Sequence, residues 1–565
     1  MKDVSKLMAI GLLVIYSLHG NATEINRRNN INDLSRLNEE RQQNEERRAR
    51  LDDKPVILVP HEELLPSKQD EQCFDVQKID LQIQSANDEK IELPNRLLFL
   101  KKVTEPYSNQ CLGINGVTEL VHKLTLSALE LGYSTTRFFI PEQDLNSGHF
   151  IINVVPGHVG DIRTTDDKYQ RLIPFVFPMS RGDLLNLRDI EQGLEQINRV
   201  GNLSATMQFL PSDEGLGFSD VLVIIQKNNQ YGLSLSADDS GPQSLGKWEG
   251  RANLTLFNPL GVADQAAFGF TRGRLREDDA DKSGVNFSYE LPFGYNRVQL
   301  LGSIDETSTT LGNEPNTFTS TGESKRLTVK VDHLFHRDQL SKWSASFKFQ
   351  RLWSRSYIND TEIEINRRYT AYAEGSVKYR RYIDAATLDA ELSHRRGVPW
   401  FGAQQDISAR SGPTFSYGLN ILDIGLGLPF TVADRQLNLY SAFRAQHTDS
   451  ELYSSEMFSI GGRYTVRGYG NDYSLLAEEG FYFRNELSSY FSSVSSTLYT
   501  GVDYGKLFGE SASENTSDQL AGFFVGIRAS LGNLYSDLFV STPLTTPDDY
   551  EGGSLHASIS LSYRL

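Results

Sequence analysis

The strongest constraint in this chain is an alternation of apolar and polar residues that extends from about Tyr231 to Leu565. Leu327, Val329 and Val331, for example, alternate with threonine, lysine and aspartate. A period of two is typical of a β-strand whose two faces meet different surroundings. We count about 16 such segments, separated by turns or polar loops. The C-terminal three-fifths of the chain is therefore predicted to be antiparallel β-structure.

Two architectures fit this pattern. In a soluble sandwich the apolar face packs on a second sheet, whereas in a transmembrane barrel it meets lipid and the charged face lines the lumen. The start of the chain favours the barrel. Lys2 and Lys6 form a positively charged region before an apolar stretch of roughly a dozen residues, and Ala22 ends a short run of small residues suited to cleavage. We interpret residues 1–22 as a signal peptide, because a membrane-spanning helix needs about 20 apolar residues.

Composition agrees with an exported barrel. No later segment is a long apolar run, and the chain is 39% hydrophobic, a share that suits strands with only alternate residues in lipid. An even strand number would close the barrel, residues 229–565, with both ends in the periplasm. The net charge of −17 argues against nucleic acid as a partner.

The N-terminal part carries no such alternation. Residues 23–53 are rich in Glu, Arg, Asn and Gln and contain neither Gly nor Pro. A helix this polar lacks the apolar face that would join it to a core. Two readings remain open: a solvated arm, or a helix that fills a polar, water-filled space. Residues 54–72 contain three prolines and are predicted to be an extended linker.

Two α+β units are expected between the linker and the barrel, at residues 73–157 and 158–228. Each is predicted to contain an amphipathic helix that ends at a glycine, Gly132 in the first and Gly201 in the second. Two strands follow each helix, which makes the units an internal repeat. The chain's two cysteines, Cys73 and Cys111, both fall in the first unit. In an exported chain this even count indicates a disulfide, which would stabilise a small domain by about 3–4 kcal/mol.

One short motif narrows the interpretation. The sequence Val466-Arg467-Gly468-Tyr469 closely resembles the motif in the sixth extracellular loop of the BamA-like barrel superfamily. The two α+β units resemble the POTRA domains of that superfamily. A polar helix before two POTRA domains is similar to the two-partner secretion (TpsB) transporters, which export haemolysins, adhesins and contact-dependent inhibition toxins. The cysteine pair also resembles a disulfide in the first POTRA domain of some members.

The resemblance implies a site inside the barrel. In the family this loop folds back into the lumen, where its arginine meets an acidic residue of the wall. The matching wall segment here is residues 498–505, so Asp503 is the expected partner of Arg467, with Gly501 and Gly505 beside it. A bidentate arginine–carboxylate pair would fix the loop. Glu479 is a competing partner.

The resemblance also implies a function. The chain would catch an unfolded exoprotein at its POTRA domains and pass it through the barrel to the cell surface, and the exoprotein would fold there into a long β-helix. The implied surroundings are outer-membrane lipid, periplasmic chaperones and the barrel assembly machinery. Two alternatives are a BamA-like assembly factor and a passive porin. Leu565 departs from the aromatic residue that typically ends such barrels.

Catalysis and cofactor binding are not expected. The segment from Gly241 to Lys247 nearly matches a phosphate-binding loop, but it lacks the following Ser or Thr and no helix is predicted after it. No HExxH or GxSxG motif occurs, and the ten histidines are scattered. We therefore predict no catalytic residue, no metal and no cofactor.

Overall fold

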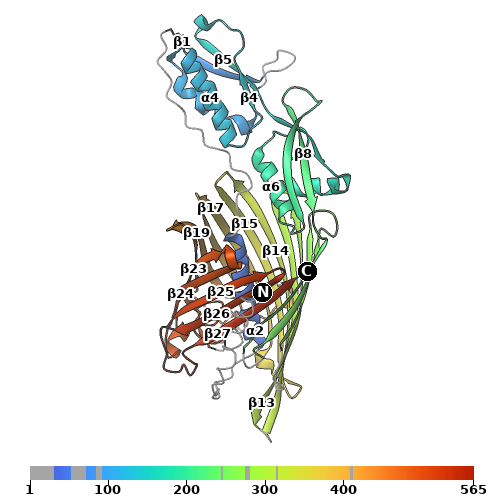
Figure 1. The fold of residues 1–565 in the computed structure, drawn as a ribbon, viewed down its shortest axis with the longest axis vertical. Helices are drawn as coiled ribbons and strands as arrows, with labels where there is room; N and C mark the ends of the chain where they lie inside the picture. The colour runs from blue at the N-terminus through green and yellow to red at the C-terminus, as the bar shows by residue number, and fades with distance from the viewer. Residues whose placement is uncertain are drawn as a thin grey trace.

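The computed structural model describes residues 31–51, 72–83, 92–242, 246–273, 280–313, 316–406, 412–471 and 473–565. The predicted signal peptide, the first residues of the predicted polar helix and nearly all of the predicted linker lie outside the described residues. The described part consists of two small α+β units, a β-barrel and one helix inside the barrel (Figure 1).

The first unit packs a helix layer on a three-stranded sheet of order β2-β5-β4. One face of the long helix is apolar, and its Leu120, Leu124 and Ala128 are buried together with Phe150 and Ile152 of the sheet. The elements are β1 (Phe74–Val76), β2 (Lys78–Ile83), α3 (Phe99–Thr104), β3 (Gln110–Leu112), α4 (Ile114–Glu130), β4 (Arg137–Phe139) and β5 (His149–Val155).

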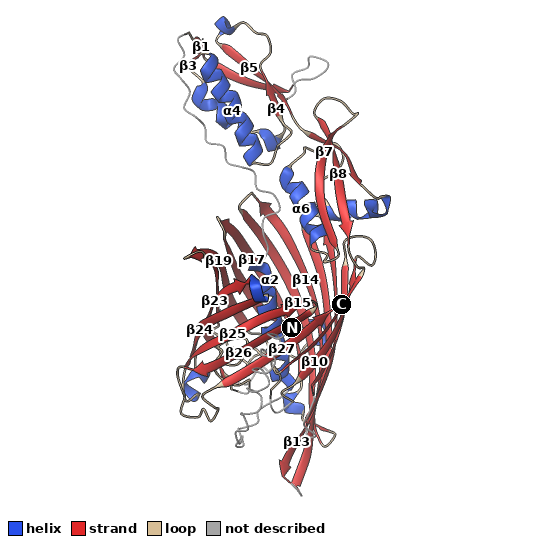
Figure 2. Ribbon diagram, in the orientation of Figure 1, coloured by secondary structure: helices blue, strands red, loops and turns tan. Residues whose placement is uncertain are grey.

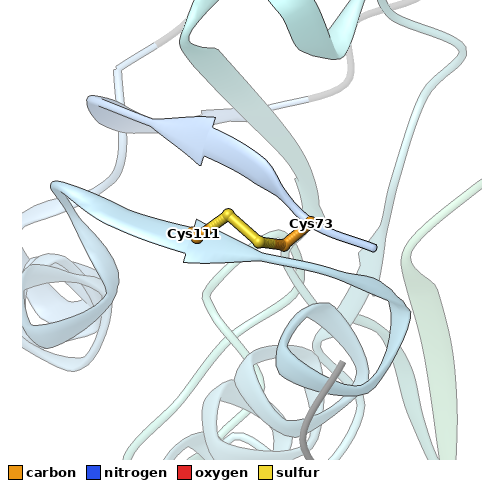
Figure 3. The surroundings of a disulfide bond; sticks show 2 residues. All are labelled: Cys73 and Cys111. Carbon is orange, nitrogen blue, oxygen red and sulfur yellow. A yellow bond between two sulfur atoms is a disulfide. The ribbon is translucent and has the colours of Figure 1, made fainter. Parts of the chain in front are cut away.

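A disulfide joins Cys73 to Cys111, with the two Cα atoms 5.3 Å apart (Figure 3). Strands β1 and β3 pair over only three residues beside it. The predicted disulfide is therefore present, and it holds together a ladder too short to be stable by itself.

The second unit repeats this plan with a sheet of order β6-β8-β7. Strand β6 pairs with β8 in parallel, and β7 forms one edge. The side chain of Asn186 caps the main helix by accepting a hydrogen bond from the backbone N–H of Arg188 at 2.8 Å. The elements are β6 (His158–Thr164), α5 (Ile173–Val176), α6 (Leu187–Asn198), β7 (Leu203–Pro211) and β8 (Phe218–Lys227).

The barrel is closed, because β9 pairs with both β10 and the last strand β27. Sixteen long strands form it, so the predicted fold class is confirmed. They are β9 (Tyr231–Asp238), β10 (Glu249–Phe257), β11 (Gln265–Gly273), β12 (Ala280–Phe293), β13 (Asn296–Asn313), β14 (Asn316–Arg337), β15 (Ser341–Ile358), β17 (Arg368–Ile383), β18 (Ala386–Gly397), β19 (Gly418–Val432), β20 (Arg435–His447), β23 (Glu479–Phe491), β24 (Ser496–Phe508), β25 (Gln519–Leu531), β26 (Leu534–Pro543) and β27 (His556–Arg564).

The alternation seen in the sequence separates the two faces of the barrel wall. Leu327, Val329 and Val331 on β14 are 43%, 39% and 36% exposed on the outer face. Thr328, between the first two, and Asp332, which follows the third, are buried on the inner face. The outside is therefore apolar and the inside polar, as a membrane barrel requires. Among the helices of the described residues, none has both the length and the apolar character to cross a membrane.

The second unit docks on the short turns at one end of the barrel through helix α6. Glu195 accepts hydrogen bonds from Arg337 and Lys342, both at 2.6 Å. Burial alone would raise the pKa of Glu195, but the charges of Lys342 and Arg337 outweigh it and lower the pKa to about 2. Gln192 and Gln196 of α6 donate to the carbonyl of Gly294 in the β12–β13 turn. This unit is therefore held at the mouth of the barrel.

Helix α2 (Ile31–Leu51) lies inside the barrel (Figure 2). Its first residue, Ile31, meets β14 near the end remote from the second unit, and its last residue, Leu51, meets β19. The helix therefore extends along the lumen between the extracellular half and the periplasmic half of the wall. A helix of this length spans about 30 Å, roughly the thickness of the membrane core.

Candidate functional site in the barrel lumen

The loop of residues 448–478, between β20 and β23, folds back into the barrel. It contains a small hairpin of β21 (Phe458–Ile460) and β22 (Leu475–Ala477). Its apolar side chains form a core with residues of the barrel wall, and Val466 of the predicted motif is completely buried there. The loop is thus fixed by packing as well as by polar contacts.

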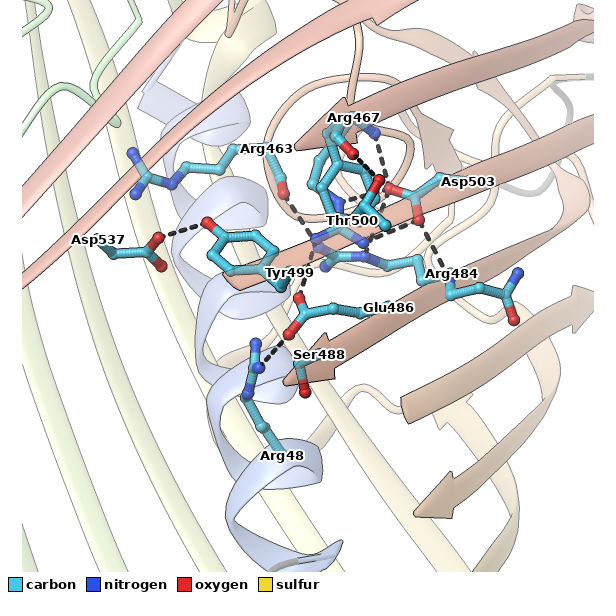
Figure 4. Close-up of polar contacts among 12 residues, drawn as sticks. Arg48, Arg463, Arg467, Arg484, Glu486, Ser488, Tyr499, Thr500, Asp503 and Asp537 are labelled. Carbon is cyan, nitrogen blue, oxygen red and sulfur yellow. Dashed lines mark hydrogen bonds and ion pairs between the residues drawn. The ribbon is translucent and has the colours of Figure 1, made fainter. Parts of the chain in front are cut away.

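Arg467 forms a bidentate contact with Asp503 of β24 (Figure 4). Its Nε donates to Oδ2 at 2.6 Å and its Nη2 to Oδ1 at 2.8 Å. The backbone N–H of Arg467 also donates to the same carboxylate. Asp503 is 0% exposed, and the guanidinium carbon lies 3.4 Å from the centroid of the Phe524 ring. Two charges are therefore buried together with satisfied hydrogen bonds, the arrangement in which removal of one partner costs most.

Glycines allow the loop to approach the wall. Gly468 has a φ of 128°, a conformation that a side chain disfavours. A Cβ on Gly505 would lie 2.7 Å from Ile460 of the loop. A Cβ on Gly501 would instead meet the backbone carbonyl of Asn485 at 1.9 Å. Both wall glycines therefore stand where no side chain fits, but only Gly505 contacts the loop.

Tyr469 anchors the end of the motif. Its hydroxyl donates to the carbonyl of Thr545 at 2.7 Å and accepts from the backbone N–H of Ala521. Its ring stacks on Tyr473. All four motif residues, Val466 to Tyr469, are therefore held by different parts of the wall or the loop.

Glu486 of β23 is a second acid at this site, and the sequence did not reveal it. It is 2% exposed and accepts from Arg528 at 2.6 Å, from Arg48 of helix α2 at 2.6 Å and from Arg467 at 3.4 Å. The other candidate acid, Glu479, instead pairs with His447. Glu486 therefore links three segments of the lumen: the wall, the loop and the helix.

Further polar contacts hold helix α2. Arg47 pairs with Asp423 of β19 at 2.5 Å, and Glu39 pairs with Arg395 of β18 at 3.1 Å. Asn44 donates to the carbonyl of Tyr464 in the loop at 2.9 Å. Arg47 is buried in its pair, whereas Glu39 keeps a quarter of its side chain exposed.

Comparison with known proteins decides the family. Residues 217–529 match the family described as haemolysin secretion/activation protein ShlB/FhaC/HecB. The chain belongs to this family. Its two N-terminal units match POTRA domains, over residues 74–157 for the ShlB-type POTRA domain and residues 158–211 for a second POTRA domain.

Individual members of the ShlB/FhaC/HecB family resemble most of this chain. The outer membrane transporter CdiB-2 of Burkholderia pseudomallei strain 1026b is 31% identical over 81% of this chain and 79% of its own length. The hemolysin transporter protein ShlB of Serratia marcescens is 25% identical over 70% of this chain and 71% of its own. The solved structure of CdiB from Escherichia coli superimposes with a TM-score of 0.87, covering 96% of this chain and all of that one, at 25% identity.

The chain is accordingly an outer-membrane transporter of the two-partner secretion type, with its POTRA domains in the periplasm. Its family is one of transporters. Among the residues that the structure describes, no group of three or more His, Cys, Asp or Glu side chains is arranged to hold a metal ion.

Proposed function

We propose that this transporter passes an unfolded exoprotein through its barrel, that the exoprotein folds into a β-helix outside the cell, and that helix α2 closes the barrel at rest. The observation that carries the proposal is a strongly polar helix held inside a closed barrel of 16 strands. A structural core helix would present an apolar stripe. Ion pairs with a partly exposed partner, such as Arg48–Glu486 and Glu39–Arg395, suit a segment that leaves when the substrate arrives.

The second POTRA domain is the proposed entry. Within the domain's described sheet, β8 pairs with only one side of the edge strand β7. On the other side the backbone of Ala205 is already bonded to the side chain of Asn198, so the open part of the edge is the stretch beyond Ala205. Phe209 and Leu210 on this strand are 36% and 42% exposed. An extended substrate segment can add to such an edge by backbone hydrogen bonds, with its side chains against the exposed apolar residues. The docking through Glu195 keeps this edge near the barrel mouth.

The loop of residues 448–478 is proposed to shape the channel rather than to leave it. The buried pair of Arg467 and Asp503 holds the loop against β24. Because the loop stays in place and the helix can leave, the open channel keeps the loop on one side and gains the volume that helix α2 occupied. Folding of the exoprotein outside the cell then biases its movement outward without ATP.

We also propose which molecules surround the transporter and which partner it exports. The transporter contacts outer-membrane lipid through its apolar outer face, and periplasmic chaperones and the barrel assembly machinery act before insertion. Its partner is a haemolysin, an adhesin or a contact-dependent inhibition toxin. We infer that it has no catalytic activity of its own.

The test is export of the exoprotein encoded beside this transporter. Arg467→Ala is expected to abolish export while the barrel still inserts, and Arg467→Lys is expected to restore little, because lysine cannot form the two-point contact. Arg272→Ala is the matched control, since Arg272 pairs with Asp281 and is half-exposed. Normal export by the Arg467→Ala variant would contradict the proposed role of the loop.

A further inference from the structure

The two ends of helix α2 differ from its middle. Ile31 and Leu51 are its first and last residues, and they are 3% and 9% exposed. Between them, the buried side chains among those described are arginines, Arg36 and Arg47. Among its described side chains, the helix therefore carries a buried branched aliphatic residue at each end and buried arginines between them.

Ile31 lies directly on a glycine of the wall. A Cβ placed on Gly322 of β14 would stand 2.7 Å from the Cβ of Ile31 and 3.1 Å from its Cγ2. The backbone of Gly322 is an ordinary β-strand, so its conformation does not require glycine. What requires glycine here is the close approach of the helix.

Leu51 lies on a second glycine position in the other half of the barrel. A Cβ on Gly425 of β19 would stand 3.1 Å from Cδ1 of Leu51, and a Cβ on Gly427 would stand 3.7 Å from its Cβ. The two glycines are two residues apart on one strand and therefore face the same side. Together they form a shallow seat for the leucine side chain.

We propose that Gly322 and the pair Gly425/Gly427 are two binding seats for branched aliphatic side chains, and that they fix the position of helix α2 in the lumen. This proposal rests on the proposed role of α2 as a plug. Ion pairs between long side chains tolerate displacement, because both partners can rotate to follow. Close packing on glycine does not, because a shift of one ångström either opens a gap or causes a clash. Two seats at opposite ends define where the helix stops along the barrel axis.

The decisive experiment exchanges the side chains across one seat. Gly322→Ala is expected to displace the helix and to raise the open fraction of channels in planar lipid bilayers by about tenfold. Ile31→Gly combined with Gly322→Ala moves the Cβ from helix to wall; it relieves the clash and is expected to restore part of the closed fraction, because the rest of the aliphatic side chain is missing. Gly375→Ala is the matched control, because a Cβ on this strand glycine would meet nothing within 4 Å.

The double variant also distinguishes a clash with Ile31 from a clash with Thr307. A Cβ on Gly322 would also lie 2.9 Å from Oγ1 of Thr307 on the neighbouring strand. If that contact caused the effect, the double variant would stay open, and the seat would be rejected. Partial closure of the double variant also shows that the alanine is compatible with a folded barrel.

The second seat predicts a graded response. Gly425→Val should open the channel, because its branched side chain needs the space that Leu51 fills, whereas Gly427→Ala should change little at 3.7 Å. Equal effects of the two substitutions would overturn the proposal. Deletion of residues 31–51 distinguishes the seats from the plug itself. If deletion opens the channel and the Gly322→Ala variant stays closed, the seats are wrong and the plug stands; if deletion leaves the channel closed, the plug is wrong as well.

Discussion

Two segments share the lumen, and they are held in opposite ways. The loop of residues 448–478 has an apolar core shared with the wall, and Arg467 is buried against Asp503. Helix α2 has a buried apolar residue only at each of its ends, among its described side chains, and its ion pairs range from the buried Arg47–Asp423 to the partly exposed Arg48–Glu486. Burial of apolar groups and of a paired charge resists exchange, whereas exposed ion pairs exchange readily with water. The apolar core that the loop shares with the wall, and that the helix lacks, supports the proposal that the loop stays in place and the helix leaves.

The largest effect is expected from the loop. Asp503→Asn should leave the buried Arg467 charge without a charged partner. For a buried pair this costs about 3–5 kcal/mol of stabilising free energy, and it should reduce export to background. The measurement is secreted exoprotein per inserted barrel, with insertion judged by heat-modifiable gel mobility. Asp518→Asn serves as the control, because its carboxylate is 47% exposed and pairs with Lys506 only at 3.4 Å. Similar export by the two variants would remove the contrast between loop and helix.

The next largest effect is expected from a substitution of Glu486, which contacts both the loop and the helix. Glu486→Gln keeps the shape but removes the charge that faces Arg48, Arg467 and Arg528. It should both weaken the closed state and lower export, since hydrogen bonds to a charged group contribute about 1.5–3 kcal/mol. Conductance and export are measured on the same preparation. A change in conductance alone would mean that Glu486 serves only the helix.

A third prediction concerns pH at the docking of the second POTRA domain. Because the folded pKa of Glu195 is about 2, below its ordinary 4.5, its ion pairs stabilise docking fully above pH 4.5. This contribution is lost as the pH falls from about 4.5 through 2. Protease cleavage between the domain and the barrel should therefore rise across this range. The Glu195→Gln variant should be more easily cleaved at pH 7 and should change less with pH; an identical pH response would reject the assignment.

The smallest effect is expected from a single exchangeable contact. Arg48 is 43% exposed, and its partner Glu486 keeps Arg528. Arg48→Ala should therefore raise the open fraction by only about twofold. A change as large as that of Glu486→Gln would mean that the helix depends on this pair more than its exposure indicates. Single-channel recording of both variants in the same lipid gives the comparison.

The sequence was a good guide where one local pattern decides the structure. Strict alternation predicted the barrel and its two faces, and the resemblance around Arg467 led to the loop. The sequence was a poor guide where partners are distant. Glu486 sits in an ordinary alternating strand, so nothing local distinguishes it from the other inward-facing polar residues. Strand β6 likewise depends on a distant partner, because it pairs in parallel with β8. The seat at Gly322 depends on a helix almost three hundred residues earlier.

That helix belongs to the same chain as the first POTRA domain, and only residues 52–72 separate the two. A segment attached in this way has an effective concentration on the order of millimolar at its own binding site. On the proposal that α2 closes the barrel, each passage of an exoprotein is therefore followed by resealing by the same chain, at a rate that does not depend on how many transporters the membrane holds. A free peptide copy of residues 31–51 would need to reach a comparable concentration to close a barrel that lacks the helix.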